Sequence, residues 1–198
     1  MAFRSRKQIR LLIFLLMVGA AYCVLFVASD GLRAQGFPEP KPTEDHNVFA
    51  QNKGTWLHEI KMYLSGPNGS PTKFQGKEEV KLVSGGLYQQ IDFRMEMPNR
   101  EFEGHFLSGY NPKAKQYQGT WVDNFTHAPC RLTGKYDGQE KQLILLGTVQ
   151  DLRGNELQQK QVTTWMDEKT KSFEIFHVFQ QGDKEISVLL MESKATKQ

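Results

Sequence analysis

The chain has 198 residues, with 25 Lys and Arg against 22 Asp and Glu, a formal net charge of +3 and 39% hydrophobic residues. Residues 1–34 contain five of the basic side chains and one of the acidic side chains, which leaves 20 basic and 21 acidic side chains in the rest of the chain. A nearly neutral domain without a basic block has no electrostatic reason to bind nucleic acid, so we expect no nucleic-acid partner.

The N-terminal segment has the pattern of an export signal. An uncharged run of 19 residues, from Leu11 to Ser29, follows four basic residues, Arg4, Arg6, Lys7 and Arg10. A transmembrane helix needs about 20 apolar residues, whereas the core of a signal peptide has about 7–15. Residues 1–29 are therefore predicted to be a signal anchor, with a signal peptide cleaved after Ser29 or Ala34 as the alternative.

The basic flank also predicts an orientation. Basic residues stay on the cytoplasmic side of a membrane, so the chain after residue 29 is expected outside the cytoplasm. The predicted location is the cell membrane, with a single span over residues 11–29. Cleavage of the leader would instead give a periplasmic or secreted protein.

Two features limit the chemistry available after the leader. Cys130 is the single cysteine beyond Cys23, so the exported part has no intramolecular disulfide. The neighbours of Cys130 include no activating base, which favours a structural role for its thiol. A bulky Tyr22 directly before Cys23 argues against lipidation of Cys23.

A linker and a short helix come next. Residues 30–44 contain prolines at alternate positions, Pro38, Pro40 and Pro42, which favour an extended spacer. A short helix is predicted from Asp45 to about Lys53, with Asp45 as its N-cap. Val48 and Phe49 would pack on the following domain.

From Gly54 onward the hydrophobic pattern has a period of two. One strand face is predicted to carry Leu87, Gln89, Ile91, Phe93, Met95 and Met97, of which five are apolar. The same alternation recurs over 56–64 and 143–149, and turn signals recur about every 10–14 residues. This pattern predicts about nine or ten antiparallel strands, and the lack of long helical patterns excludes parallel βαβ units.

The predicted domain, residues 45–198, is an all-β, antiparallel, up-and-down barrel of the lipocalin or calycin type, with a flattened sandwich as the alternative. A barrel of this size has an interior that side chains fill or that holds one small ligand. The residues predicted to line such a cavity are aromatic or Met: Trp56, Met62, Phe93, Met95, Phe106, Trp121, Trp165 and Phe176.

The order and spacing of several motifs resemble a known family. These motifs are His46, Gly54-Thr55-Trp56, Gly85-Gly86, Phe102-Glu103-Gly104, Gly109-Tyr110-Asn111, Tyr117, Thr120-Trp121-Val122-Asp123, Gly134-Lys135-Tyr136-Asp137, Gly182-Asp183-Lys184-Glu185 and Met191-Glu192. Together they are similar to the bacterial family called domain of unknown function 1579, over about residues 45–195. The resemblance implies a calycin-like barrel, but no activity, cofactor or catalytic residues.

No motif predicts a catalytic or metal site. The five histidines lack a compact metal-ligand spacing, and no C-x-x-C is present. Ser84 and Ser108 lack the G-x-S-x-G frame, and the adjacent acids Glu78 and Glu79 would face opposite sides of a strand. His177 could ligate haem inside a barrel, as in nitrobindin-like proteins, but a half-exposed strand position is the favoured interpretation. No cofactor or metal is therefore expected.

The leading hypothesis is that the barrel binds a small apolar or amphipathic molecule without catalysis. The alternative is a filled barrel that serves as a structural or protein-interaction module, with Tyr63, Tyr88 and Leu107 on its outer face. The remaining hypotheses are an enzyme with an acid–base pair assembled across strands, and a haem-binding barrel.

Overall fold

The computed structural model describes residues 39–66, 68–150 and 154–198. The expected signal anchor or signal peptide lies outside these residues, as does most of the linker. None of the helices in the described residues is both long and apolar enough to cross a membrane. Lys41–Gln198 form one compact unit.

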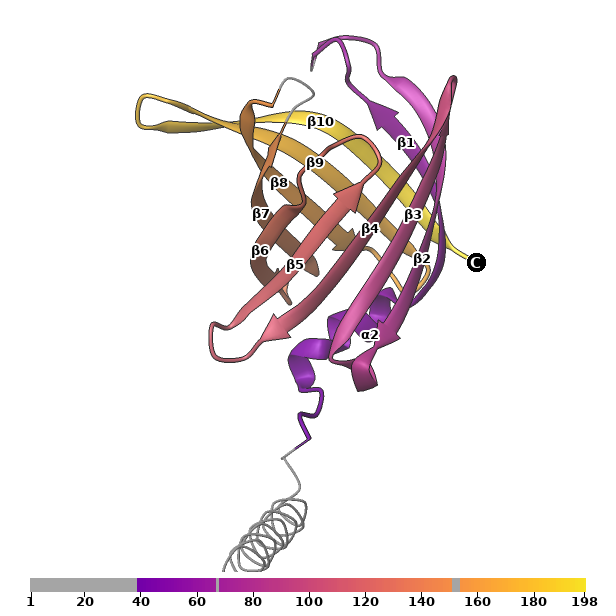
Figure 1. The fold of residues 1–198 in the computed structure, drawn as a ribbon, viewed down its shortest axis with the longest axis vertical. Coiled ribbons are helices and arrows are strands. Elements are labelled where there is room, and N and C mark those ends of the chain that lie inside the picture. The colour runs from indigo at the N-terminus through magenta and orange to yellow at the C-terminus, as the bar shows by residue number, and fades with distance from the viewer. Residues whose placement is uncertain (1–38, 67, 151–153) are drawn as a thin grey trace, which may run out of the picture. The chain divides into compact units, whose positions relative to one another are not determined.

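This unit is a closed antiparallel barrel of ten strands in the order of the chain (Figure 1). The strands are β1 Gly54–Met62, β2 Thr72–Val83, β3 Tyr88–Met97, β4 Arg100–Asn111, β5 Gln116–Asp123, β6 Cys130–Asp137, β7 Gln142–Gln150, β8 Glu156–Trp165, β9 Thr170–Gln181 and β10 Lys184–Lys197. The predicted all-β, up-and-down barrel is confirmed, and the sandwich alternative is wrong.

Pairing of the first and last strands closes the sheet. Trp56 lies opposite Lys197, and Met62 lies opposite Met191, in an antiparallel β1–β10 ladder. Closure removes the unpaired edges that an open ten-stranded meander would leave at β1 and β10.

The alternation in the sequence determines which side chains face inward. In β1, Trp56, His58 and Ile60 are buried, whereas Leu57 and Glu59 between them are exposed. Successive side chains of a strand point to opposite faces, so one face of each strand lines the barrel interior. The inward face of β1 includes a histidine, which becomes important at the candidate site.

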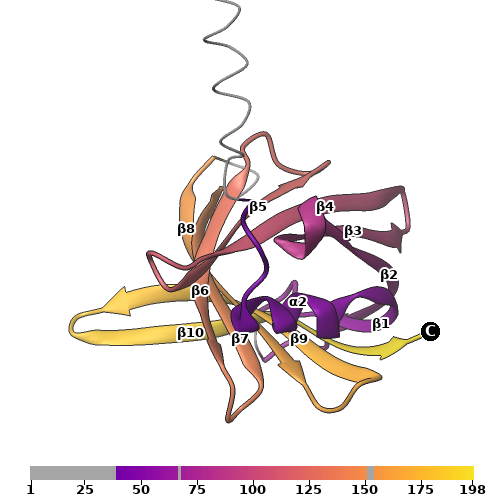
Figure 2. The same ribbon diagram turned by 90° about the horizontal axis from the view of Figure 1, so that it is seen from below.

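A short helical segment covers one end of the barrel (Figure 2). It consists of a 3-10 turn, η1 Glu44–His46, followed by α2 Asn47–Asn52. The prediction of Asp45 as N-cap is wrong, because the helical segment begins one residue earlier and Thr43 is the capping residue of the turn. The Thr43 N–H donates to Nδ1 of His46 at 2.9 Å.

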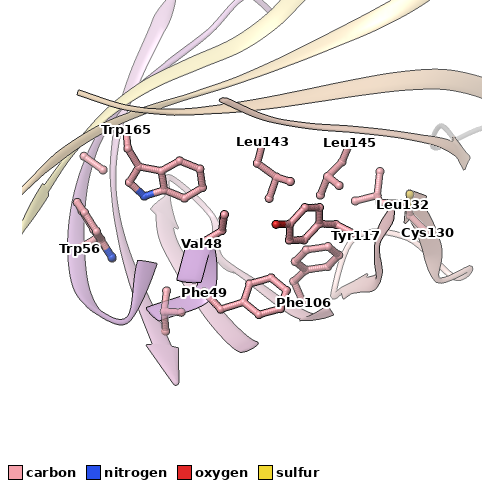
Figure 3. Close-up of a cluster of buried hydrophobic side chains, with 12 residues drawn as sticks. Val48, Phe49, Trp56, Phe106, Tyr117, Cys130, Leu132, Leu143, Leu145 and Trp165 are labelled. Carbon is pink, nitrogen blue, oxygen red and sulfur yellow. The ribbon is translucent and has the colours of Figure 1, made fainter. Parts of the chain in front are cut away.

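The main hydrophobic core lies at the end covered by α2 (Figure 3). Val48 and Phe49 of α2 are buried, as predicted, and the Phe49 ring lies edge-on to Tyr117 at a centroid distance of 5.7 Å. The Tyr117 hydroxyl donates to the carbonyl oxygen of Asp45 at 2.7 Å, which fastens the helical segment to β5. The unit therefore has a closed sheet and its own core, the requirements of an independently folding domain.

Candidate ligand-binding cavity

The barrel contains a cavity of about 520 Å³. It extends from Asn52 of α2 to the other end of the barrel, where Phe125 of the β5–β6 loop and Gln150, the last residue of β7, belong to its lining. Pockets for small organic ligands typically measure about 300–1,000 Å³. The cavity is therefore large enough for one small molecule.

Six of the eight residues predicted to line the cavity do so: Met62, Phe93, Met95, Phe106, Trp121 and Trp165. Within the described residues, the lining includes neither Trp56 nor Phe176. Trp56 is fully buried at the α2 end, where its Nε1 donates to the carbonyl oxygen of Asn52 at 2.8 Å. It closes the barrel beneath the cavity.

The prediction for Phe176 is wrong because β9 has the opposite register. Phe173, Ile175 and His177 line the cavity, so Phe176 lies on the other face of the strand. The Lys160 ammonium lies 5.6 Å from the centroid of the Phe176 ring. His177 is half-buried in the lining, and this burial lowers the pKa of its imidazole.

Aromatic side chains form one wall of the cavity. Phe102 contacts Phe93 at a centroid distance of 6.0 Å and is stacked on Trp121 at 6.2 Å. The Trp121 indole N–H is already used, since it donates to Oδ2 of Asp123 at 2.7 Å. A Cβ atom at Gly104 would overlap the Trp121 ring, so this glycine makes room for the wall. We call Phe93, Phe102 and Trp121 the aromatic wall.

The middle of the inward face of β8, between Leu157 and Trp165, is polar by contrast. Gln159, Gln161 and Thr163 belong to the lining, and Nε2 of Gln161 donates to Oε1 of Gln159 at 2.8 Å. These side chains are uncharged and contain both donors and acceptors. A ligand in this cavity therefore meets an apolar surface on one side and neutral hydrogen-bonding groups on another.

A chain of side-chain hydrogen bonds crosses the α2 end of the cavity. The bonds measure 2.6–3.1 Å and join β10, β1, β2, β9, α2, β3 and β4 in that order. All of the participating residues are buried. In order they are Ser193, His58, Glu78, Lys171, Asn52, Gln89 and Ser108, which we call the floor network.

An ion pair lies at the centre of the floor network. Oε1 of Glu78 accepts from the Lys171 ammonium at 2.6 Å, and Oε2 lies 3.0 Å from Nε2 of His58. A carboxylate can only accept, so Nε2 of His58 carries a proton, and Nδ1 of His58 lies within hydrogen-bond distance of the Ser193 hydroxyl, at 3.0 Å. The Lys171 ammonium also lies 4.4 Å from the centroid of the Trp56 ring.

The environment of Glu78 favours its ionised form. Burial alone would raise the pKa of Glu78, but the Lys171 charge and the hydrogen bonds from His58 and Lys171 outweigh burial and lower it to about 2. Burial lowers the pKa of Lys171, and Glu78 opposes that shift. Each member of the buried pair therefore favours the ionised form of the other and offsets the effect of burial.

This shift predicts a dependence of stability on pH. The pKa of Glu78 falls from its ordinary value of 4.5 to about 2 on folding, so the ionised carboxylate stabilises the fold above pH 4.5. We expect about 3 kcal/mol of this stabilisation to be lost as pH falls from 4.5 to 2. Urea unfolding of residues 41–198 at several pH values measures it. The difference in stability between the wild type and Glu78→Gln should shrink as pH falls, and a constant difference would contradict the assignment.

Within the floor network, the Ser193 hydroxyl, the His58 imidazole and the Glu78 carboxylate are hydrogen-bonded in the order found in hydrolases. Acyl transfer also needs donors aimed at the developing oxyanion. The backbone of β10 around Ser193 is paired on both sides, with Ile60 of β1 and Phe173 of β9.

Sequence reasoning missed the six members of the floor network that line the cavity. One signal could have identified them. Each is a polar side chain at a position that is buried or faces the barrel interior, where apolar side chains are the rule. The six are Asn52, His58, Glu78, Gln89, Lys171 and Ser193. In β1 and β3, His58 and Gln89 interrupt predicted inward faces that are otherwise mostly apolar.

Cys130, for which the sequence favoured a structural role, can be placed in the structure. Cys130 is buried with a free thiol, and burial raises the pKa of this thiol. In residues 39–66, 68–150 and 154–198, no three His, Cys, Asp or Glu side chains are grouped so that they could hold a metal ion.

Comparison with known families identifies the chain. A family model described as a protein of unknown function, DUF1579, matches residues 41–195. The chain belongs to this family. The resemblance noted in the sequence is thereby confirmed, and the match covers β1 to β9 and all but the last two residues of β10.

One solved structure and the curated proteins complete the comparison. The crystal structure of Rv2717c from M. tuberculosis matches this DUF1579 protein with a TM-score of 0.53 and 9% sequence identity. The match covers 79% of this chain and 98% of that chain. At this identity the similarity concerns the fold alone. No curated protein matches the chain.

The outer face of this DUF1579 protein carries some of the residues expected there. Tyr88 is 44% exposed and Leu107 is 51% exposed. Tyr63 is instead half-buried, and its hydroxyl donates to Oε1 of Glu192 at 3.0 Å. These positions remain candidates for a protein contact under the alternative hypothesis.

Proposed function

We propose that this DUF1579 protein binds one small amphipathic molecule inside its barrel, without catalysis. The observation that carries the proposal is the cavity of about 520 Å³ lined on one side by aromatic and Met side chains and bounded at one end by the floor network. A preformed, mostly apolar cavity with a few convergent polar groups is the usual form of a small-molecule site.

The proposal includes a location. The basic and apolar pattern of residues 1–29 supports attachment to the cell membrane, with the barrel outside the cytoplasm. The proline-containing residues 30–44 would then separate the barrel from the lipid surface.

A bulky substitution in the cavity tests the proposal. Thr163 lines the cavity, whereas Thr164, the next residue of β8, lies on the opposite face. We expect residues 41–198 to bind the neutral fluorophore 1-aminoanthracene, and Thr163→Trp to weaken this binding at least about tenfold by filling the cavity. Fluorescence titration measures both affinities.

Thr164→Trp is the matched control, because it adds the same indole to the outer face and should leave the affinity unchanged. Circular dichroism should show that both variants keep the barrel. Binding that is absent in the wild type, or reduced equally by the two substitutions, would contradict a site inside the barrel.

A further inference from the structure

One buried donor in the cavity lining has no acceptor. Within the described residues, Nε1 of Trp165 is the one buried side-chain nitrogen or oxygen without a hydrogen-bond partner. Trp165 is 2% exposed, and its ring belongs to the cavity lining. Buried donors in proteins are almost always paired, so this N–H calls for an acceptor that the protein itself does not supply.

The position of Trp165 places this donor at the floor of the cavity. Trp165 lies directly opposite Lys171 in the β8–β9 ladder. Figure 3 shows its nitrogen on the edge of the ring that is turned toward Trp56 and away from Leu143. The Lys171 ammonium of the floor network lies 4.4 Å from the centroid of the same Trp56 ring, so the free indole N–H is turned toward this end of the barrel.

The charge balance at the floor determines what kind of acceptor fits. The Lys171 ammonium is already matched by the Glu78 carboxylate at 2.6 Å. Lys197, whose ammonium lies 4.9 Å from the centroid of the Trp56 ring, is half-buried outside the cavity lining and donates to the carbonyl oxygen of Gln51 at 3.1 Å. A ligand carboxylate at the floor would add a buried charge without a free partner, which is strongly unfavourable.

From these observations we infer that the ligand is an uncharged amphipathic molecule whose carbonyl or ether oxygen accepts the Trp165 N–H. Its apolar face lies against the aromatic wall, and further neutral polar groups face Gln159, Gln161 and Thr163 on β8. The inference rests on the proposed function and narrows it. It excludes both free carboxylic acids and plain hydrocarbons as the preferred class of ligand.

Three probes with the same number of carbon atoms test the inference. Hexanophenone has a neutral carbonyl, 4-pentylbenzoate has a carboxylate, and hexylbenzene has no polar group. We expect residues 41–198 to bind hexanophenone about fivefold to tenfold more tightly than hexylbenzene, the gain from one neutral hydrogen bond. The benzoate should bind most weakly. Native mass spectrometry and calorimetry at pH 7.5 measure the three affinities.

Trp165→Phe removes the N–H but keeps an aromatic ring, so it should reduce the ketone-to-hydrocarbon affinity ratio to about one. Trp56→Phe is the matched control, because Trp56 lies outside the cavity lining and its N–H is already bonded to the carbonyl oxygen of Asn52. That variant should keep the wild-type ratio. Using a ratio removes the effect of any general change in packing.

The outcomes separate the two proposals. If hexanophenone and hexylbenzene bind equally, or if Trp165→Phe leaves the ratio unchanged, the inference is wrong although the cavity still binds ligands. Tightest binding of the benzoate would also overturn it. If the wild type binds neither these probes nor 1-aminoanthracene, both the inference and the proposed function fail.

Discussion

Replacing Glu78 with Gln will lower the free energy of unfolding of residues 41–198 by about 3–5 kcal/mol, the usual cost of removing one partner of a buried ion pair. The substitution keeps the shape of the side chain but leaves the Lys171 ammonium without a counter-charge. Lys171 is only 2% exposed, so solvent does not replace that charge. Urea unfolding followed by circular dichroism measures the change.

Two further variants make this prediction specific. Adding Lys171→Met to Glu78→Gln removes the uncompensated charge, so the double variant should recover most of the lost stability. Glu79→Gln, at the next position of β2, breaks an ion pair with Lys77 that is exposed to solvent and should change stability little. A Glu78→Gln variant as stable as Glu79→Gln would show that the buried pair contributes no net stability.

Replacing Phe49 with Ala will lower the free energy of unfolding by about 3–5 kcal/mol, since a buried aromatic ring is lost and a cavity remains. Phe49 is 0% exposed, and its ring contacts both His46 and Tyr117. It is the largest apolar side chain that α2 places in the barrel end. The loss of unfolding free energy should therefore be much larger than the change in helix propensity at one position of a six-residue helix would produce.

Phe179→Ala provides the control, because Phe179 is 44% exposed near the tip of the β9–β10 hairpin. Its removal should cost well under about 1 kcal/mol. The same urea titration applies to both variants. Equal effects would mean that α2 does not contribute to the core, and that the barrel end is stabilised by the strands alone.

The barrel was predictable because its strands keep a strict period of two. In β3, Gln89, Ile91 and Met95 fall on the predicted inward face, and all three belong to the lining. A one-residue shift would move every side chain to the opposite face, so a half-buried strand strongly determines its own register. The family motifs added the closure of the sheet to this local information.

β9 shows where that reasoning was insufficient. Both of its faces carry apolar residues, with Phe173 and Ile175 on one face and Phe176 and Val178 on the other. Periodicity alone therefore does not determine which face lines the cavity. The structure places His177 inside with Ile175, whereas the prediction had placed Phe176 there.

The floor network could not be predicted from local sequence. Its hydrogen bonds join residues that are far apart in the chain, such as His58 and Ser193, separated by 135 positions, or Lys171 and Asn52, separated by 119. Each member appears in the sequence as an isolated polar residue in a strand or helix. Only the closed sheet shows that these side chains meet and satisfy one another.

The pairing of β1 with β10 also determines when the domain can become complete during synthesis. Trp56 of β1 emerges from the ribosome early, but its ladder partner Lys197 belongs to β10, which is the last of the barrel strands to emerge. Until then the nascent sheet has two open edges and an uncovered apolar interior, the features that make an incomplete β domain prone to association. A chain stopped before β10 would therefore yield an open sheet that chaperones must hold, and not a smaller functional barrel.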